Sequence, residues 1–333
     1  EQFIYQGQVW GIPGRVTINV MSYNKDLFDA AGLDYHGADW TTSDFLHLAT
    51  TLTQGEGESK QYGYLPGYDE VQDLIAMIGR LGGGMYDASV DPPRVVFNSR
   101  NVIEAVRWYT SLPAFAVQAR DAHLDGEKRW ALIAQGQAAI WNDPWGKIET
   151  KEFDVGVAPL PVGPHSAEGS GFESVNGFFI SAETDARQAC WAWITFLTQQ
   201  PSVASGLPAR REVAESDAYR QAVGVERADA YIASVSSGSK ASFMQRMSDK
   251  ESWLLKFSFG MLSSAYDRIV AGDMTVDEAM NAAQEAMDVY RDCAITNNAF
   301  QPPDWDALGA CFAQANAAVP DLAGGVPDLA GGK

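Results

Sequence analysis

The sequence predicts an α/β fold divided into two lobes, and three observations lead to that expectation. Short apolar segments with strand character alternate with helical stripes along most of the chain, which is typical of the α/β class. The length of 333 residues exceeds what a single hydrophobic core usually supports, so two domains are favoured. A hydrophobic content of 46% with 20% charged residues is ordinary for a globular protein and argues against disorder.

The predicted strands begin close to the first residue. Residues 9–13 form a short strand that a proline ends, and residues 18–23 form the next one. Residues 138–141 are continuously apolar, as expected of a buried strand, and apolar side chains alternate over residues 153–157. After a glycine-rich, irregular stretch, residues 178–180 form the last predicted strand.

The predicted helices are apolar stripes bounded by capping residues. Asn24 caps a short helix that Gly32 stops, so we interpret the segment Tyr23-Asn24-Lys25-Asp26 as structural. Residues 186–197 form a strongly apolar helix. A long helix follows with aromatic and apolar side chains spaced four apart from Trp253, and a capping box at residues 275–278 opens another.

The charge balance excludes several classes of partner. Asp and Glu outnumber Lys and Arg by 43 to 24, and the net charge of −19 disfavours nucleic acid and anionic membrane surfaces. No apolar run approaches the ~18 residues that a membrane-spanning helix needs. The four histidines show no metal-ligand spacing, so neither a metal nor another cofactor is expected.

The three cysteines leave one question open. Cys190 lies on an apolar helical stripe and is interpreted as an inert buried thiol. Cys293 and Cys311 can pair if the compartment is oxidising, and the sequence does not decide whether they do.

Several short motifs occur in one order along the chain. They are GIP at 11–13, SYNKDLF at 22–28, DPW at 143–145, VAPLP at 157–161 and GLPAR at 206–210. In this order the motifs resemble those of the family 1 extracellular solute-binding proteins, which deliver sugars to ABC importers. The resemblance covers roughly residues 1–292.

The resemblance implies a periplasmic-binding-protein-like type II fold, in which two lobes are joined by a multi-strand hinge and a solute binds between them. It also implies an extracytoplasmic protein, periplasmic or lipid-anchored, that is not an enzyme. Its partners would be a small solute and the permease subunits of an ABC transporter. Few lysines lie in the candidate loops, so a neutral mono- or oligosaccharide is favoured over a phosphorylated one.

One departure from the family pattern concerns the first lobe. In the family a long stretch precedes the region that carries the GIP and YNKDLF motifs, so we expect a fragment with an incomplete first lobe. The expected parts are 1–19 with 158–237 (first lobe), 20–157 with 238–292 (second lobe), and 293–333 (an extension with a flexible tail). An incomplete sheet would leave four side chains unusually exposed, namely Phe178, Ile180, Trp193 and Phe196.

The candidate site follows from what a sugar requires. The C–H face of the ring needs an aromatic plane, and the hydroxyls need donors and acceptors. Trp145 follows a predicted strand, where α/β lobes bind ligands, and in the resemblance this tryptophan stacks on a pyranose; core filling is the alternative. Trp141, Asn142 and Asp143 lie just before it, and strand alternation would turn some of them the same way.

Polar side chains elsewhere complete the candidate site. Alternation places three of them on one strand face, which suits a cleft wall, with a solvated face as the alternative. Three more lie in the glycine-rich loop, where the backbone can approach a ligand closely. These six are Arg15, Thr17 and Asn19 on the strand, and Glu173, Ser174 and Asn176 in the loop. The others are Tyr68 and Asp69, for which helix capping is the alternative, Arg210, for which it is a surface ion pair, and Phe257, for which it is core packing.

Two further functions stay open beside solute binding. A glycosidase would need paired carboxylates, and Asp143 with Glu173 are the candidates, although nothing in the sequence fixes their separation. The GSGFE segment lacks the GxSxG spacing of a nucleophile elbow. A sensing module built on the same lobes is the third possibility.

Overall fold

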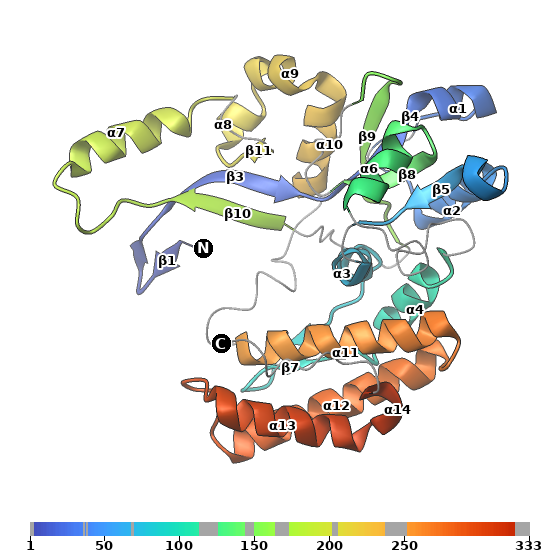
Figure 1. Ribbon diagram of the computed structural model, residues 1–333. Coiled ribbons are helices and arrows are strands. Elements are labelled where there is room, and N and C mark those ends of the chain that lie inside the picture. Colours follow the sequence, from blue (N-terminus) through green and yellow to red (C-terminus); the bar gives the residue numbers. More distant parts are fainter. Residues whose placement is uncertain are drawn as a thin grey trace. The chain divides into compact units, whose positions relative to one another are not determined.

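The chain forms two compact units in the computed structural model, which describes residues 3–35, 37, 39–67, 70–112, 126–143, 150–163, 173–201, 206–236 and 252–323 (Figure 1). Unit 1 comprises residues 1–68, 115–162 and 168–240, and unit 2 comprises residues 69–114, 163–167 and 241–333. These boundaries differ from those of the expected lobes, and the division into lobes stays a prediction. In the described part of the chain, no helix is both long enough and apolar enough to cross a membrane.

The first sheet of unit 1 has the strand order β5-β8-β4-β9. Its strands are β5 (Tyr62–Leu65), β8 (Ala138–Asp143), β4 (Val20–Asn24) and β9 (Val155–Pro159). Strand β8 is parallel to β5 and antiparallel to β4, which is antiparallel to β9. Every residue of β4 and β8 is buried, as expected of central strands covered on both faces.

Helices α1 (Lys25–Ala31), α2 (Thr42–Thr51) and α6 (Gly126–Ala134) and the short 3₁₀ helix η1 (Gly57–Ser59) belong to the same unit. The predicted cap of α1 is confirmed: the Asn24 side chain accepts from the Leu27 amide. Gly32 ends the helix at a φ of 65°, which an L side chain rarely adopts.

The second sheet of unit 1 has the order β10-β3-β11 and is antiparallel. Its strands are β3 (Ile12–Ile18), β10 (Glu173–Phe178) and β11 (Leu207–Pro208). The expected strand over 9–13 is wrong, because β3 runs through Pro13 and residues nearer the first residue form the separate hairpin β1 (Ile4–Tyr5) with β2 (Gln8–Val9).

Proline is tolerated in β3 because the register shifts there, between Asn176 and Gly177 on β10. Gly14 next to it is required by close approach, since a Cβ would lie 2.5 Å from the Phe178 ring. Strand β10 also corrects the expectation that its residues form an irregular loop and that a strand covers 178–180.

The helices after β10 are α7 (Arg187–Leu197), α8 (Arg211–Ala214), α9 (Asp217–Val223) and α10 (Val225–Ser236). Tyr219 and Tyr231 of α9 and α10 share a hydrophobic cluster with Val16 and Ile18 of β3. Helix α7 instead exposes its aromatic side chains, and the predicted exposure of Trp193 and Phe196 is confirmed. Phe178 and Ile180 are half-buried.

Unit 2 is mostly helical. It contains α3 (Glu70–Arg80), α4 (Arg100–Tyr109), α11 (Ser252–Ala271), α12 (Val276–Thr296), α13 (Trp305–Ala318), α14 (Pro320–Ala323) and the hairpin β6 (Tyr86–Asp87) with β7 (Arg94–Val95). The predicted capping box of α12 is confirmed, with Thr275 and Glu278 each accepting from the other's backbone N–H. The aromatic core is formed between α11 and α12, where the Phe257 ring stacks on the Tyr290 ring with 4.3 Å between the ring centroids.

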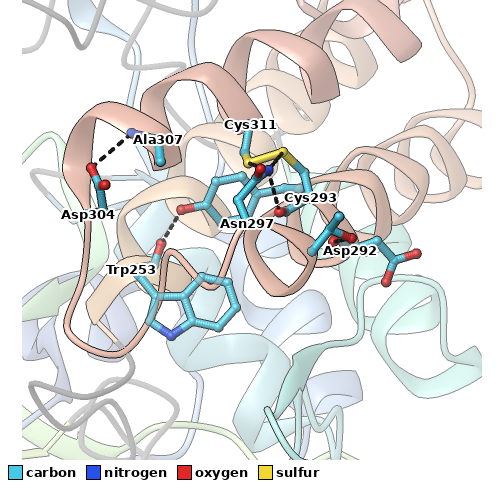
Figure 2. Close-up of a disulfide and its surroundings, with 9 residues drawn as sticks. Trp253, Asp292, Cys293, Asn297, Asp304, Ala307 and Cys311 are labelled. Carbon is cyan, nitrogen blue, oxygen red and sulfur yellow. Dashed lines mark hydrogen bonds between the residues drawn. A yellow bond between two sulfur atoms is a disulfide. The ribbon is translucent and has the colours of Figure 1, made fainter.

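A disulfide joins α12 to α13 and answers the question that the sequence left open. The sulfur atoms of Cys293 and Cys311 are bonded, and the Asn297 amide beside them donates to the Cys293 carbonyl (Figure 2). Asp304 caps α13 by accepting from the Ala307 amide (Figure 2). Residues Pro320–Ala323 of the extension form α14 with Leu322 buried, so the expectation of a flexible tail is wrong for this part; residues 324–333 lie outside the described residues.

Candidate ligand-binding site

Polar and apolar side chains alternate along the second half of β3, as predicted, and so lie on opposite faces of the strand. Val16 and Ile18 pack into the cluster with α9 and α10, so Arg15 and Thr17 belong to the other face. Thr17 is only 9% exposed, and Asn19, which follows the strand, only 6%. This burial disfavours the alternative of a solvated strand face.

Strand β10 extends this polar face. Arg15 is opposite Asn176, so these two side chains share a face of the sheet, and Thr17 is opposite Ser174 in the backbone register. The side chains of Glu173 and Ser174 lie outside the described residues.

A hollow of about 330 Å³ opens beside the polar face, entirely within unit 1. It is lined by Gly14, Arg15, Asn176, Gly177, Phe178, Leu197, Thr198, Gln200 and Pro208. Arg210 adjoins it, because its Nε donates to the Thr198 hydroxyl at 3.0 Å. Three candidates from distant parts of the sequence, Arg15, Asn176 and Arg210, therefore come together here.

The start of β4 and the end of β8 carry a second polar group. Val20 is opposite Asp143 and Met21 is opposite Asn142. Asp143 is buried and its Oδ2 accepts from the Ser22 hydroxyl at 3.2 Å. Asn19 directly precedes β4, and its buried Oδ1 has no donor among the described residues. That oxygen can accept a hydrogen bond from a solute hydroxyl.

Two candidates take the core alternative instead. Trp141 is fully buried in a cluster with Leu65 and Ile133. Phe257 is buried as well, with Tyr290 stacked on its ring and Phe312 in edge contact, both at 4.3 Å. Both rings are enclosed by core side chains and are not part of the proposed site.

Three candidates lie outside the described residues: Tyr68, Asp69 and Trp145. The chain positions that lead to them, Gly67 and Asp143, are described. Their roles stay predictions.

The YNKD segment is structural, as predicted, and its partner is a residue that the sequence reading missed. Glu226, in the first turn of α10, accepts from the Tyr23 hydroxyl at 2.9 Å and the Val157 amide at 3.1 Å, and it pairs with Lys25. Burial alone would raise the pKa of Glu226, but these hydrogen bonds outweigh it and hold the pKa below its ordinary value. Glu226 therefore anchors α10 on β9.

The fold and the site define a class of protein. The chain is α/β in two compact units, and solved type II periplasmic binding proteins match 84–88% of it with TM-scores of 0.62–0.65, so it has their fold. The chain belongs to the bacterial extracellular solute-binding protein family, whose model matches residues 2–204.

Individual relatives are distant. The maltodextrin-binding protein MdxE of Bacillus subtilis is 22% identical over 228 residues, which are 66% of this chain and 53% of that protein. UgpB of Mycobacterium tuberculosis, solved with glycerophosphocholine, is 19% identical with a TM-score of 0.65, covering 88% of this chain and 73% of that one. Maltose-bound MalE3 of T. maritima is 17% identical with a TM-score of 0.64, covering 86% and 74%. The chain spans about half the length of the curated relatives it matches.

Proposed function

We propose that the protein is the solute-binding component of an ABC importer and that it binds a neutral sugar or polyol. The polar strand face of unit 1 supports this most directly: Thr17 and Asn19 are buried there, and the Asn19 Oδ1 lacks a donor among the described residues. Hydroxyl and amide groups of this kind suit the hydroxyls of a sugar, which both donate and accept. Family membership supports the same function.

The contacts to the solute come from several segments in this proposal. Asn142 and Asp143 at the end of β8 join Arg15, Thr17 and Asn19, and Asn176 of β10 extends the surface. Trp145, two residues beyond Asp143, supplies the aromatic plane. Glu173, Ser174, Tyr68, Asp69 and Arg210 are the remaining proposed contacts. The two lobes close about a hinge when the solute binds, and a permease recognises the closed form.

Binding without chemistry is favoured over a carbohydrate-active enzyme. Asp143, one of the two candidate carboxylates, is buried and accepts a hydrogen bond from Ser22. This contact links the end of β8 to β4 and gives the carboxylate a structural role. The relatives matched are binding proteins. Incubation of the protein with maltotetraose should leave the oligosaccharide intact, and release of shorter sugars would favour the enzyme.

An extracytoplasmic location fits the disulfide of unit 2. Disulfides persist in oxidising compartments and are rare in the cytosol of mesophiles. The Cys293–Cys311 bond therefore supports transport over an intracellular sensing role. Genes for permeases beside this one would favour transport, and genes for signalling proteins would favour sensing.

A thermal-shift screen of the full chain tests the proposal. The panel contains maltose, maltotetraose, ribitol, mannitol, tagatose and glycerophosphocholine. A solute at a hundredfold excess over its Kd stabilises the native state by about 2.7 kcal/mol, which raises Tm by roughly 4 °C for a chain of this length. Calorimetry then measures Kd for the best solute. No shift and no heat of binding with any member would contradict the proposal for this class of solutes.

A further inference from the structure

The strongest feature that the proposed site does not explain is a buried arginine in unit 1. Arg129 lies in α6 and is only 1% exposed. Its Nε donates to the Pro66 carbonyl at 3.0 Å, and its Nη2 donates to the Asn142 carbonyl. Burying a guanidinium costs free energy, which these hydrogen bonds offset. A buried arginine at this position therefore needs an explanation beyond packing.

Both carbonyls lie just beyond the end of the parallel ladder between β5 and β8. This ladder pairs Tyr64 with Ile140 and, last, Leu65 with Trp141. Pro66 directly follows β5, and Asn142 is the next residue of β8, which continues to Asp143. A buried carbonyl at the end of a ladder needs another donor, and the planar guanidinium supplies two donors in a fixed geometry.

Helix α6 holds this arginine against the strand ends. Ile133, one turn further along the same helix face, packs with Leu65, Ala138 and Trp141. Arg129 is thus fixed at both ends, by its helix and by the two carbonyls.

The chain leaves both strand ends toward proposed solute contacts. Asn142 and Asp143 are contacts themselves, and Trp145 follows two residues later. On the other strand Gly67 follows Pro66 and leads to Tyr68. We propose that Arg129 is a positioning residue for solute binding: by holding the Pro66 and Asn142 carbonyls together it fixes the backbone at the end of the β5–β8 ladder, where the proposed contacts Asn142 and Asp143 lie. The inference rests on the proposed function.

Two variants separate positioning from general stability. Arg129→Lys keeps the positive charge and loses the two-carbonyl geometry, and Arg129→Met loses both. Glu226→Gln is the matched control. It also removes a charged side chain that hydrogen-bonds to backbone within unit 1, but this side chain holds α10 on β9. Each is compared with the wild-type full chain.

The first measurement does not need a solute. Hydrogen exchange by mass spectrometry should become at least tenfold faster at the amides of Gly67, Asn142 and Asp143 in both Arg129 variants, with exchange in α10 unchanged. Glu226→Gln should give the opposite pattern. Unchanged exchange at Gly67, Asn142 and Asp143 in Arg129→Lys would overturn the proposal. So would failure of Arg129→Lys to fold where Glu226→Gln folds, because Arg129 would then support the whole unit.

The second measurement is the calorimetric Kd for the best solute in the screen. We expect at least a tenfold weaker Kd for Arg129→Lys and a Kd within twofold of wild type for Glu226→Gln. A wild-type Kd retained by Arg129→Lys would overturn the positioning role while leaving the proposed function intact. If the wild type binds no solute, the proposed function fails, and the exchange pattern still decides whether Arg129 orders the two strand ends.

Discussion

Helices α7 and α11 have similar aromatic-rich sequences and opposite environments. Trp193 of α7 is 59% exposed and, among the described residues, stacks on Phe196 of the same helix. Trp253 of α11 is buried, its carbonyl accepts from the Tyr290 hydroxyl, and Phe257 one turn later is enclosed by α12 and α13. An apolar stripe therefore predicts that a helix forms, whereas burial depends on which elements the chain brings against it.

The largest expected difference is in the cost of losing one tryptophan. Trp253→Ala should lower the free energy of unfolding by about 3–5 kcal/mol, because it opens a cavity in a closed aromatic core. Trp193→Ala should change it by less than ~0.5 kcal/mol, as exposed positions usually do. Chemical denaturation measures both, and similar losses for the two variants would refute the comparison.

The disulfide should be the next largest contribution. Replacing Cys293 and Cys311 together by alanine should cost about 3 kcal/mol, because the bond closes a short loop in the unfolded chain. Cys190→Ala on α7 is the matched control and should leave stability nearly unchanged. Denaturation with and without a reducing agent checks this, and a double variant as stable as the oxidised wild type would show that α13 is held by packing alone.

The comparison also separates two uses of aromatic rings in unit 1. Trp145→Ala should weaken solute binding by roughly 1–3 kcal/mol, through lost area and ring contact. Trp193→Ala should leave affinity unchanged. If calorimetry gives the reverse pattern, the exposed face of α7 is the binding surface and the strand-end site is wrong.

The smallest effect concerns charge. Helix α10 is anchored through Glu226, whose pKa is lowered in the folded state, so this stabilisation is present above its ordinary pKa of 4.5 and is lost as pH falls through the folded value. Its side chain is 44% exposed, so salt should weaken the effect. Wild type should have a higher Tm than Glu226→Gln at neutral pH, with the difference vanishing in acid. A difference that persists in acid would assign Glu226 a packing role.

Local chemistry could be read from the sequence, and long-range pairing could not. The Asn24 cap, the capping box at Thr275 and the alternation of Arg15 with Thr17 follow from neighbouring residues, and each is present in the structure. The strand through Pro13 was missed because proline's tolerance there depends on the register with β10, more than 150 residues away.

The candidate site, too, could be predicted only where it depends on neighbouring residues. Polar alternation identified the face of β3, but the burial of Trp141 and Phe257 depends on partners that the sequence does not name. Arg129 gave only a weak signal, a charged residue four positions before Ile133 on an otherwise apolar helix face. Its role becomes visible only once the ladder between β5 and β8 is seen to end at Leu65 and Trp141.

The most direct test of solute binding by the polar strand face is a calorimetric titration of Asn19→Ala beside the wild type. Asn98→Ala in unit 2, which removes an exposed amide pair with Asn281, is the control. Loss of one hydrogen bond to the solute should weaken binding by about 1 kcal/mol, roughly fivefold, while the control binds as wild type does. Equal affinities for Asn19→Ala and the wild type, with both folded, would contradict the account.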